Sequence, residues 1–251
     1  MALSNSTNYT TSRDAIITRA LRIVNEIATG ETPSATRISE CALVLNDIFK
    51  EWEALGMQLW KITTFPITLT ANTGSYTIGI GSTVNVTAPT KILHCYSRNT
   101  SVTPNTDNPL IPLTKQEYDL YNAKSVNSSV TQWYYNPPGA SAAELQGTIY
   151  FINRPDATEA STHTIYATGV LPFMDFDSST DTPDIPSYLF NALVWALAEQ
   201  LSYEAGVPLA ERSMISKQAD KHLGRAMSFD IEEGSLYIQP SWLSYRLEEN
   251  P

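Results

Sequence analysis

Four basic residues near the C-terminal end of the chain could bind an anionic partner. They are Arg212, Lys217, Lys221 and Arg225. The last three repeat every four residues and so share one face of a helix. Such a strip suits DNA phosphates or an acidic protein surface. The simpler interpretation is a solvated face whose cations are favoured by the dipole near the helix C-terminus, because Glu211 and Asp220 interrupt the strip.

Four aspartates precede this region, and alternating carboxylates of this kind can ligate calcium. They are Asp175, Asp177, Asp181 and Asp184. An EF-hand loop needs glycine at its sixth position, and Thr180 stands there instead. We therefore interpret the segment as a solvated linker that ends in a helix cap at Asp184.

Sequence motifs for catalysis are not found. Gly79-Ile80-Gly81 lacks the lysine and the following helix of a phosphate-binding loop. The chain has neither a His-Glu-x-x-His pattern nor a Gly-x-Ser-x-Gly elbow. We expect no catalytic residues, no cofactor and no metal site. A pair of carboxylates for glycoside hydrolysis stays an open alternative, because the distance between two such groups depends on the three-dimensional fold and not on their spacing in the sequence.

Histidine and cysteine are also too dispersed for a metal centre. The histidines are His94, His163 and His222, and the cysteines are Cys41 and Cys95. A metal site needs convergent ligands. We expect each histidine to be structural or on the surface, and both cysteines to be reduced and buried.

Two amphipathic helices are predicted in the first 56 residues. The first has capping-box spacing at Thr11 and Asp14 and is predicted to end at Gly30, which suits a left-handed helix end. The second is predicted to start with Pro33 in its first turn and to end at Gly56.

Two more helices are predicted near the C-terminal end. The segment Leu189–Leu201 is apolar almost all round, which is typical of a helix covered on several sides. Gly206 and Pro208 separate it from the fourth helix. The fourth helix is expected to direct five residues inward: Leu209, Ile215, Ala219, Leu223 and Ala226.

The middle of the chain has the alternation of β-strands. Phe65, Ile67 and Leu69 alternate with polar residues, and Tyr76 and Ile78 resume the alternation after a turn, which predicts a hairpin. Further strands are predicted at Lys91–Tyr96, Gln132–Tyr135, Gly147–Asn153 and His163–Val170, with loops at Asn99–Pro109 and Asn136–Ala143 and a short helix at Lys115–Lys124. This spacing predicts a small antiparallel barrel or sandwich.

The predicted fold class is α+β. Neither helical hairpin can bury its apolar stripe alone, so we predict one four-helix core that includes Trp52 and Trp195. An antiparallel β module is inserted into this core, and an extended tail follows it. The predicted parts are 1–62 (first part of the helical core), 63–176 (β module), 177–230 (second part of the core) and 231–251 (C-terminal arm).

The C-terminal arm is rich in aromatic and aliphatic residues but has no helical period. Disordered segments are usually poor in such residues. The arm either folds back on its own core or orders on a partner. The candidate anchoring residues are Leu236, Tyr237, Ile238, Trp242, Leu243 and Tyr245.

The chain of 251 residues has 42% hydrophobic residues and a net charge of −10. This charge argues against general nucleic-acid binding and against anionic membrane surfaces. It suits a surface past which DNA slides without sticking. The polar N-terminus does not read as a signal peptide, and no apolar stretch approaches membrane-spanning length, so we expect no membrane association.

Two stretches carry a resemblance to a known family. One is the helix through Phe49, Trp52 and Gly56 that leads into the strand Phe65–Leu69. The other is the start at Asp184-Ile185-Pro186 of an alanine-rich helix, with Gly206 and a second helix to Ala226 after it. With this layout the chain resembles the head-to-tail adaptors of short-tailed bacteriophages, also called tail accessory or connector proteins.

The resemblance implies a structural role in the virion. Adaptors of this family form a ring, usually of twelve copies, beneath the portal protein, extend the DNA channel, and dock the tail nozzle and fibres. The expected partners are therefore the portal, tail nozzle or tail fibre proteins, neighbouring copies, and DNA that passes non-specifically through the lumen. The expected location is the head-tail junction of the virion, after assembly in the host cytoplasm. The C-terminal arm is expected to contact the portal.

Two other function classes stay open. One is a virion-associated hydrolase that degrades the cell wall with acidic residues. The other is a carbohydrate-binding β module on a helical stalk.

Overall fold

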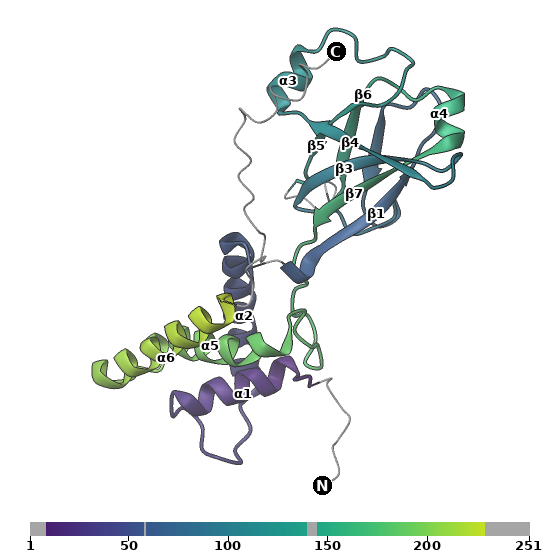
Figure 1. Ribbon diagram of the computed structural model, residues 1–251. Helices are drawn as coiled ribbons and strands as arrows, with labels where there is room; N and C mark the ends of the chain where they lie inside the picture. The colour runs from purple at the N-terminus through teal and green to yellow at the C-terminus, as the bar shows by residue number, and fades with distance from the viewer. Residues whose placement is uncertain (1–8, 58, 140–144, 229–251) are drawn as a thin grey trace, which may run out of the picture.

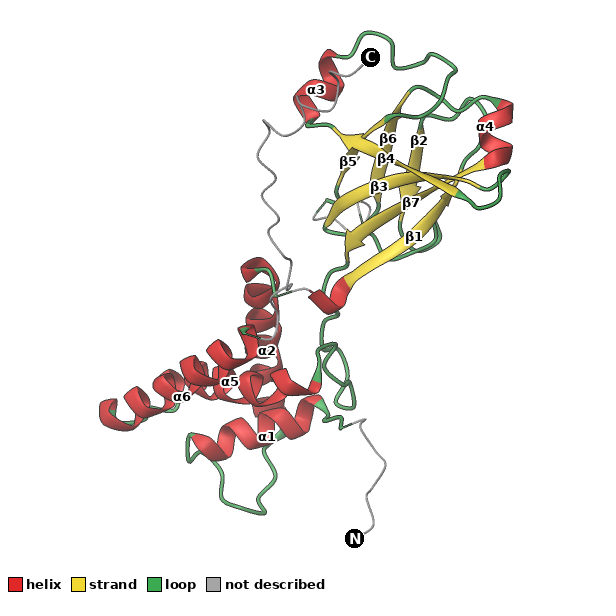
Figure 2. Ribbon diagram, viewed as in Figure 1, coloured by secondary structure: helices red, strands yellow, loops and turns green. Residues whose placement is uncertain are grey.

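A computed structural model of the chain describes residues 9–57, 59–139 and 145–228, and it shows a helical part joined to a curled β-sheet (Figure 1; Figure 2). The helical part consists of α1 (Arg13–Ile23), α2 (Ala35–Leu55), η3 (Ser187–Leu189), α5 (Phe190–Glu204) and α6 (Leu209–Met227). The chain crosses to the sheet through the short 3₁₀ helix η1 (Leu59–Lys61) and returns after β7. The predicted α+β class is confirmed.

Helix α1 begins and ends at residues other than those predicted. The hydroxyl oxygen of Ser12, not that of Thr11, accepts the cap hydrogen bond, from the backbone amide of Ala15 at 3.3 Å. The predicted extension to Gly30 is wrong. Asn25 has a φ of 59°, in the left-handed region that asparagine tolerates, and the chain leaves the helical path there.

Helix α2 is capped by Ser34, whose hydroxyl oxygen accepts from the amide of Arg37 at 3.2 Å. Pro33 therefore precedes the helix instead of filling its first turn. Gly56 ends the helix with a φ of 85°, as predicted, because glycine carries no side chain that would clash in this conformation.

One hydrophobic cluster contains buried residues from α1, α2, α5 and α6 and from the loop that follows the sheet. Helix α5 contributes most of its length to this cluster, and it packs against α1, α2 and α6. Within α6, Ile215, Ala219 and Ala226 are buried as predicted. Leu209 was also predicted to point inward, and this is wrong, because it is 75% exposed. Trp52 is 2% exposed, while Trp195 is only partly buried.

The sheet has seven strands in the order β1-β7-β3-β4-β5-β6-β2. Their bounds are β1 (Ile62–Thr68), β2 (Ser75–Ile78), β3 (Lys91–Asn99), β4 (Thr106–Pro112), β5 (Gln132–Asn136), β6 (Gly147–Ile152) and β7 (His163–Val170). Two short helices lie in connections between strands: α3 (Lys115–Leu120) between β4 and β5, and α4 (Ala157–Thr162) between β6 and β7. All strand pairs are antiparallel except β4 with β5.

Two sequence predictions about the sheet are wrong. β1 and β2 do not form a hairpin: β1 pairs with β7, β2 pairs with β6, and the two strands lie at opposite ends of the strand order. The segment Thr106–Pro112 is a strand, although its polar residues and prolines indicated part of a loop. The inward alternation itself is correct, because residues from both strands, including Phe65, Ile67 and Tyr76, belong to a second hydrophobic cluster inside the curled sheet.

Polar and aromatic contacts join the helical part to the sheet. The buried ammonium group of Lys61 pairs with the carboxylate of Asp184. The indole N–H of Trp60 donates to the backbone carbonyl of Asp184 at 3.1 Å, and the Trp60 ring stacks on Phe173 with a centroid distance of 5.6 Å. The amide of Leu171 donates to the carbonyl of Lys61 at 3.0 Å. Asp184 therefore serves this junction instead of capping a helix as predicted.

Replacing Trp52 with alanine is expected to lower the free energy of unfolding by about 3–5 kcal/mol, the usual range for a large buried aromatic residue. Urea unfolding measures this change. Leu43→Ala is the matched control on the same helix, because Leu43 is 68% exposed and its loss should change stability little. Equal effects of the two substitutions would show that Trp52 is not in the core.

Asp184→Ala is expected to cost about 3 kcal/mol, the lower end of the range for a buried ion pair that loses one partner, since Asp184 is only partly buried while Lys61 is left buried and unpaired. Thermal and urea unfolding measure the loss. Asp177→Ala is the control, because Asp177 is an exposed carboxylate in the same loop. If Lys61→Met in the Asp184→Ala background gives no recovery, the unpaired charge is not the cause.

Candidate interaction surface

Helix α6 presents three cations side by side. Lys217, Lys221 and Arg225 are exposed on its outer face, as the sequence predicts. The fourth candidate, Arg212, is half-buried instead: its guanidinium group lies 4.8 Å from the ring centroid of Tyr203, in a cation–π contact. The outer strip of α6 therefore consists of three cations.

Side chains from α1 and α5 connect to this strip. The guanidinium group of Arg19 donates to the side-chain oxygen of Asn191 at 3.1 Å, and the amide nitrogen of Asn191 lies 3.0 Å from Nδ1 of His222. The His222 ring stacks on Trp195 with a centroid distance of 5.9 Å. These contacts carry the positive surface across α5, from α6 to α1.

Burial and this positive environment both shift the pKa of His222. Burial lowers it below its ordinary value of 6.5, and the nearby cations Arg225, Lys221 and Arg19 lower it further. The imidazole is thus neutral near pH 7, and the positive charge comes from its neighbours.

Cations elsewhere in the protein are mostly paired. Arg37 binds Glu26 at 2.7 Å and also contacts Glu40 and Glu204, and Arg98 binds Asp107 at 2.7 Å. In contrast, five residues of α1 and α6 form no ion pair within the described residues: Arg19, Arg22, Lys217, Lys221 and Arg225. We refer to these five residues as the basic surface. In a chain of net charge −10, such a concentration of unpaired cations marks a candidate contact surface.

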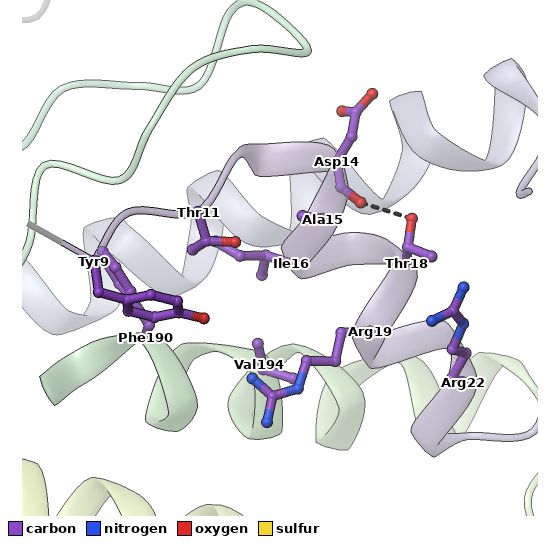
Figure 3. Close-up of a pocket in the computed structure, with 10 residues that line it drawn as sticks. All are labelled: Tyr9, Thr11, Asp14, Ala15, Ile16, Thr18, Arg19, Arg22, Phe190 and Val194. Atoms are coloured by element: carbon purple, nitrogen blue, oxygen red, sulfur yellow. Dashed lines mark hydrogen bonds between the residues drawn. The ribbon is translucent and has the colours of Figure 1, made fainter. Parts of the chain in front are cut away.

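A hollow of about 460 Å³ lies between α1 and α5, next to the basic surface (Figure 3). Arg19 and Arg22 line it, and Tyr9 packs on Phe190 with a centroid distance of 5.7 Å. The one carboxylate in its lining, Asp14, is paired with Arg13 at 3.0 Å. The lining therefore does not offer the pair of carboxylates that glycoside hydrolysis requires.

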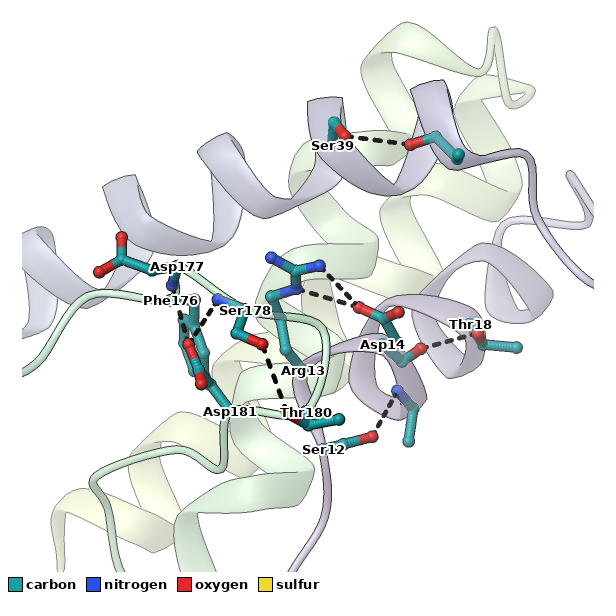
Figure 4. A network of polar contacts seen from close by, with 12 residues as sticks. Ser12, Arg13, Asp14, Thr18, Ser39, Phe176, Asp177, Ser178, Thr180 and Asp181 are labelled. Atoms are coloured by element: carbon teal, nitrogen blue, oxygen red, sulfur yellow. Dashed lines mark hydrogen bonds and ion pairs between the residues drawn. The ribbon is translucent and has the colours of Figure 1, made fainter.

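Three of the linker aspartates, Asp175, Asp181 and Asp184, use their carboxylates in structural contacts, and Figure 4 shows those of Asp181. The carboxylate of Asp181 accepts from the amides of Asp177 at 2.9 Å and Ser178 at 2.6 Å, and its carbonyl accepts from the amide of Arg13 at 2.8 Å. Asp175 pairs with Lys50 at 2.8 Å. Among the residues the structure describes, no group of three or more His, Cys, Asp or Glu side chains could hold a metal ion.

The β module has two aromatic clusters that sequence reasoning did not find. Tyr118 of α3 stacks on Tyr134 at 5.4 Å and contacts Tyr150 at 5.3 Å. On β3 and β7, Tyr96 stacks on Tyr166 at 5.3 Å, and the Arg98 guanidinium group lies over both rings. Strand pairing places Tyr96 beside Tyr166 and Tyr134 beside Tyr150, and the packing of α3 adds Tyr118. A local sequence pattern shows neither the strand pairing nor the packing of α3.

The predicted anchors of the C-terminal arm, Leu236 to Tyr245, lie outside the described residues. Of the helices that the structure does describe, none is long and apolar enough to cross a membrane.

Comparison with known proteins gives one family. A family model described as the SU10 adaptor protein matches residues 10–235, which include the helical part and the sheet. No curated protein matches the chain.

The stability of the protein is expected to fall as the pH drops below about 6.5, in part through His222. The folded-state pKa of His222 is lowered, so the unfolded state binds the proton first and stability is lost as the pH falls from 6.5 towards the folded pKa. Urea unfolding between pH 7.5 and 5 measures the loss, and His222→Gln should reduce it. An equal loss in both proteins would mean that His222 does not contribute.

Proposed function

Because the chain belongs to the SU10 adaptor protein family, we propose that it is a structural adaptor of a phage virion that forms a ring beneath the portal, extends the DNA channel, and docks the tail nozzle or fibres. Membership of this family is the observation that carries the proposal. The resemblance to head-to-tail adaptors agrees with it. The proposed role is structural and not enzymatic.

The division of the molecule supports contact with two partners. The helical part and the sheet have separate hydrophobic clusters, so each can present a surface without disturbing the other. We propose that the helical part faces the portal and that the sheet faces the tail. The joint around Lys61 and Asp184 then sets the angle between the two contacts.

The charge of the protein supports passage of DNA. An acidic protein binds phosphate weakly, so a lumen built from it allows DNA to slide. We propose about twelve copies in the ring, as in the adaptors that the chain resembles. The proposed location is the head-tail junction of the virion, after assembly in the host cytoplasm.

We further propose that the C-terminal arm attaches the ring to the portal. Its aromatic residues, Trp242 and Tyr245 among them, are of the type that dominates binding energy at interfaces. Several such anchors offset the entropy lost when an arm becomes ordered on its partner.

Electron microscopy of the purified protein mixed with portal rings tests the adaptor function. Added rings on the portal are expected. A protein that stays monomeric with the portal and cleaves purified peptidoglycan would contradict the proposal and favour a hydrolase.

Truncation after Asp230 is expected to leave folding intact but to abolish ring attachment, and Trp242→Ala in the full chain should weaken attachment by tenfold or more, as for an aromatic hot spot. Co-sedimentation with portal rings measures attachment, and circular dichroism checks the fold. Loss of the cooperative melt on truncation would place the arm in the subunit's own core. Unchanged attachment would show that the arm is not the attachment element.

A further inference from the structure

The outer faces of α2 and α6 carry opposite charges at the same helical interval. On α6, Lys217, Lys221 and Arg225 are four residues apart, and on α2, Asp47 and Glu51 are also four residues apart. All five side chains are exposed. Four residues of helix advance about 6 Å, so charges on the two helices can meet in register.

The described residues do not neutralise these charges. In the part of the chain that the structure describes, neither Asp47 nor Glu51 forms an ion pair, and the same holds for Lys217 and Lys221. Both helices direct their buried residues into the cluster around α5, so their outer faces point away from it. The two strips therefore lie on separate surfaces and cannot pair with each other in one copy.

An exposed apolar side chain accompanies each strip. Leu43, four residues before Asp47, is 68% exposed, and Met214, three residues before Lys217, is 69% exposed. Apolar contacts beside charges of opposite sign are typical of a protein interface, in which the apolar area supplies affinity and the charges fix the register.

Gly224 gives an independent indication of close approach. It lies inside α6, on the same outer face, between Lys221 and Arg225. Glycine within a helix is less favourable than alanine, because its backbone loses more conformational freedom on folding. Nothing in the described chain lies within 4 Å of the position that a Cβ atom would take there, so the fold itself does not require glycine. A partner helix that packs closely on this face would require it.

We propose that α6 of one copy docks on α2 of the next copy. The basic strip of α6, which consists of Lys217, Lys221 and Arg225, lies against Asp47 and Glu51, and Gly224 lies at the closest approach of the two helices. Such an interface joins two different surfaces, so it repeats around an axis and closes into a ring when the rotation allows. Ring closure rests on the proposed adaptor function, while the pairing of the two helices does not.

The apolar residue and the glycine favour a protein helix over DNA as the occupant of the basic strip. Phosphate binding needs cations, but it gains nothing from an exposed methionine or from the absence of a side chain at position 224. DNA binding by this strip is an outcome that the test distinguishes.

A charge swap between two variants tests the proposal. Lys217→Glu with Lys221→Glu should repel α2 of the next copy, and Asp47→Lys with Glu51→Lys should repel α6. Each variant alone is expected to need at least a tenfold higher concentration for half-assembly, because like charges meet at the interface. An equal mixture should assemble as an alternating ring, since every contact between the two variants is again of opposite charge. Mass photometry and analytical ultracentrifugation, with and without portal rings, measure assembly.

Two further variants complete the test. Lys91→Glu changes one exposed lysine of the sheet and should leave assembly unchanged. Gly224→Gln should raise the melting temperature, because glutamine favours helix, and yet weaken assembly by blocking close approach. Circular dichroism confirms that each variant is folded.

The remaining outcomes separate failure of this interface from failure of the adaptor function. Assembly of either charge-reversed variant at the wild-type concentration, or a mixture no better than its components, excludes the α2–α6 contact. Loss of duplex DNA binding with unchanged assembly assigns the strip to DNA. If portal rings recruit the wild-type protein and the swap has no effect, the adaptor function stands and this interface fails. If the mixture associates in solution but portal rings recruit nothing, the interface stands and the adaptor function fails.

Discussion

The burial of α5 is the constraint on which the rest of the structure depends. A helix that is apolar almost all round is stable only when neighbours cover several of its sides. The chain supplies α6 from the sequence next to it, but α1 and α2 come from more than 130 residues earlier. The two ends of the intervening segment must therefore come back to the same place. This return allows Lys61 to meet Asp184 and allows β1 to lie beside β7.

Local patterns predicted the elements of the sheet better than their partners. The predicted strand His163–Val170 has the bounds of β7, and the predicted strand Lys91–Tyr96 is found as β3, which runs three residues further to Asn99. Alternation shows which face of a strand is buried, but it does not identify the neighbouring strand, so the pattern wrongly predicts a hairpin of β1 and β2. The sequence pattern does not predict Thr106–Pro112 as a strand, because only Leu110 within it is buried.

The candidate surface was predictable only where its residues lie on one helix. The spacing of Lys217, Lys221 and Arg225 placed them together. Arg19 and Asn191 join them through contacts between helices distant in sequence, which no local pattern encodes. Leu209 and Asp184 show the converse, because both matched a local rule and the tertiary structure uses them differently.

The pairing of β1 with β7 has a mechanical consequence. Ile62 lies opposite Val170, so the strand that leaves the helical part and the strand that returns to it are attached at the same end of the pair. A pull on the sheet away from the helices loads both strands in the same direction. The tension is shared by two covalent backbones and does not shear the hydrogen bonds between β1 and β7, so the joint resists extension through its chain and not through its weakest contacts.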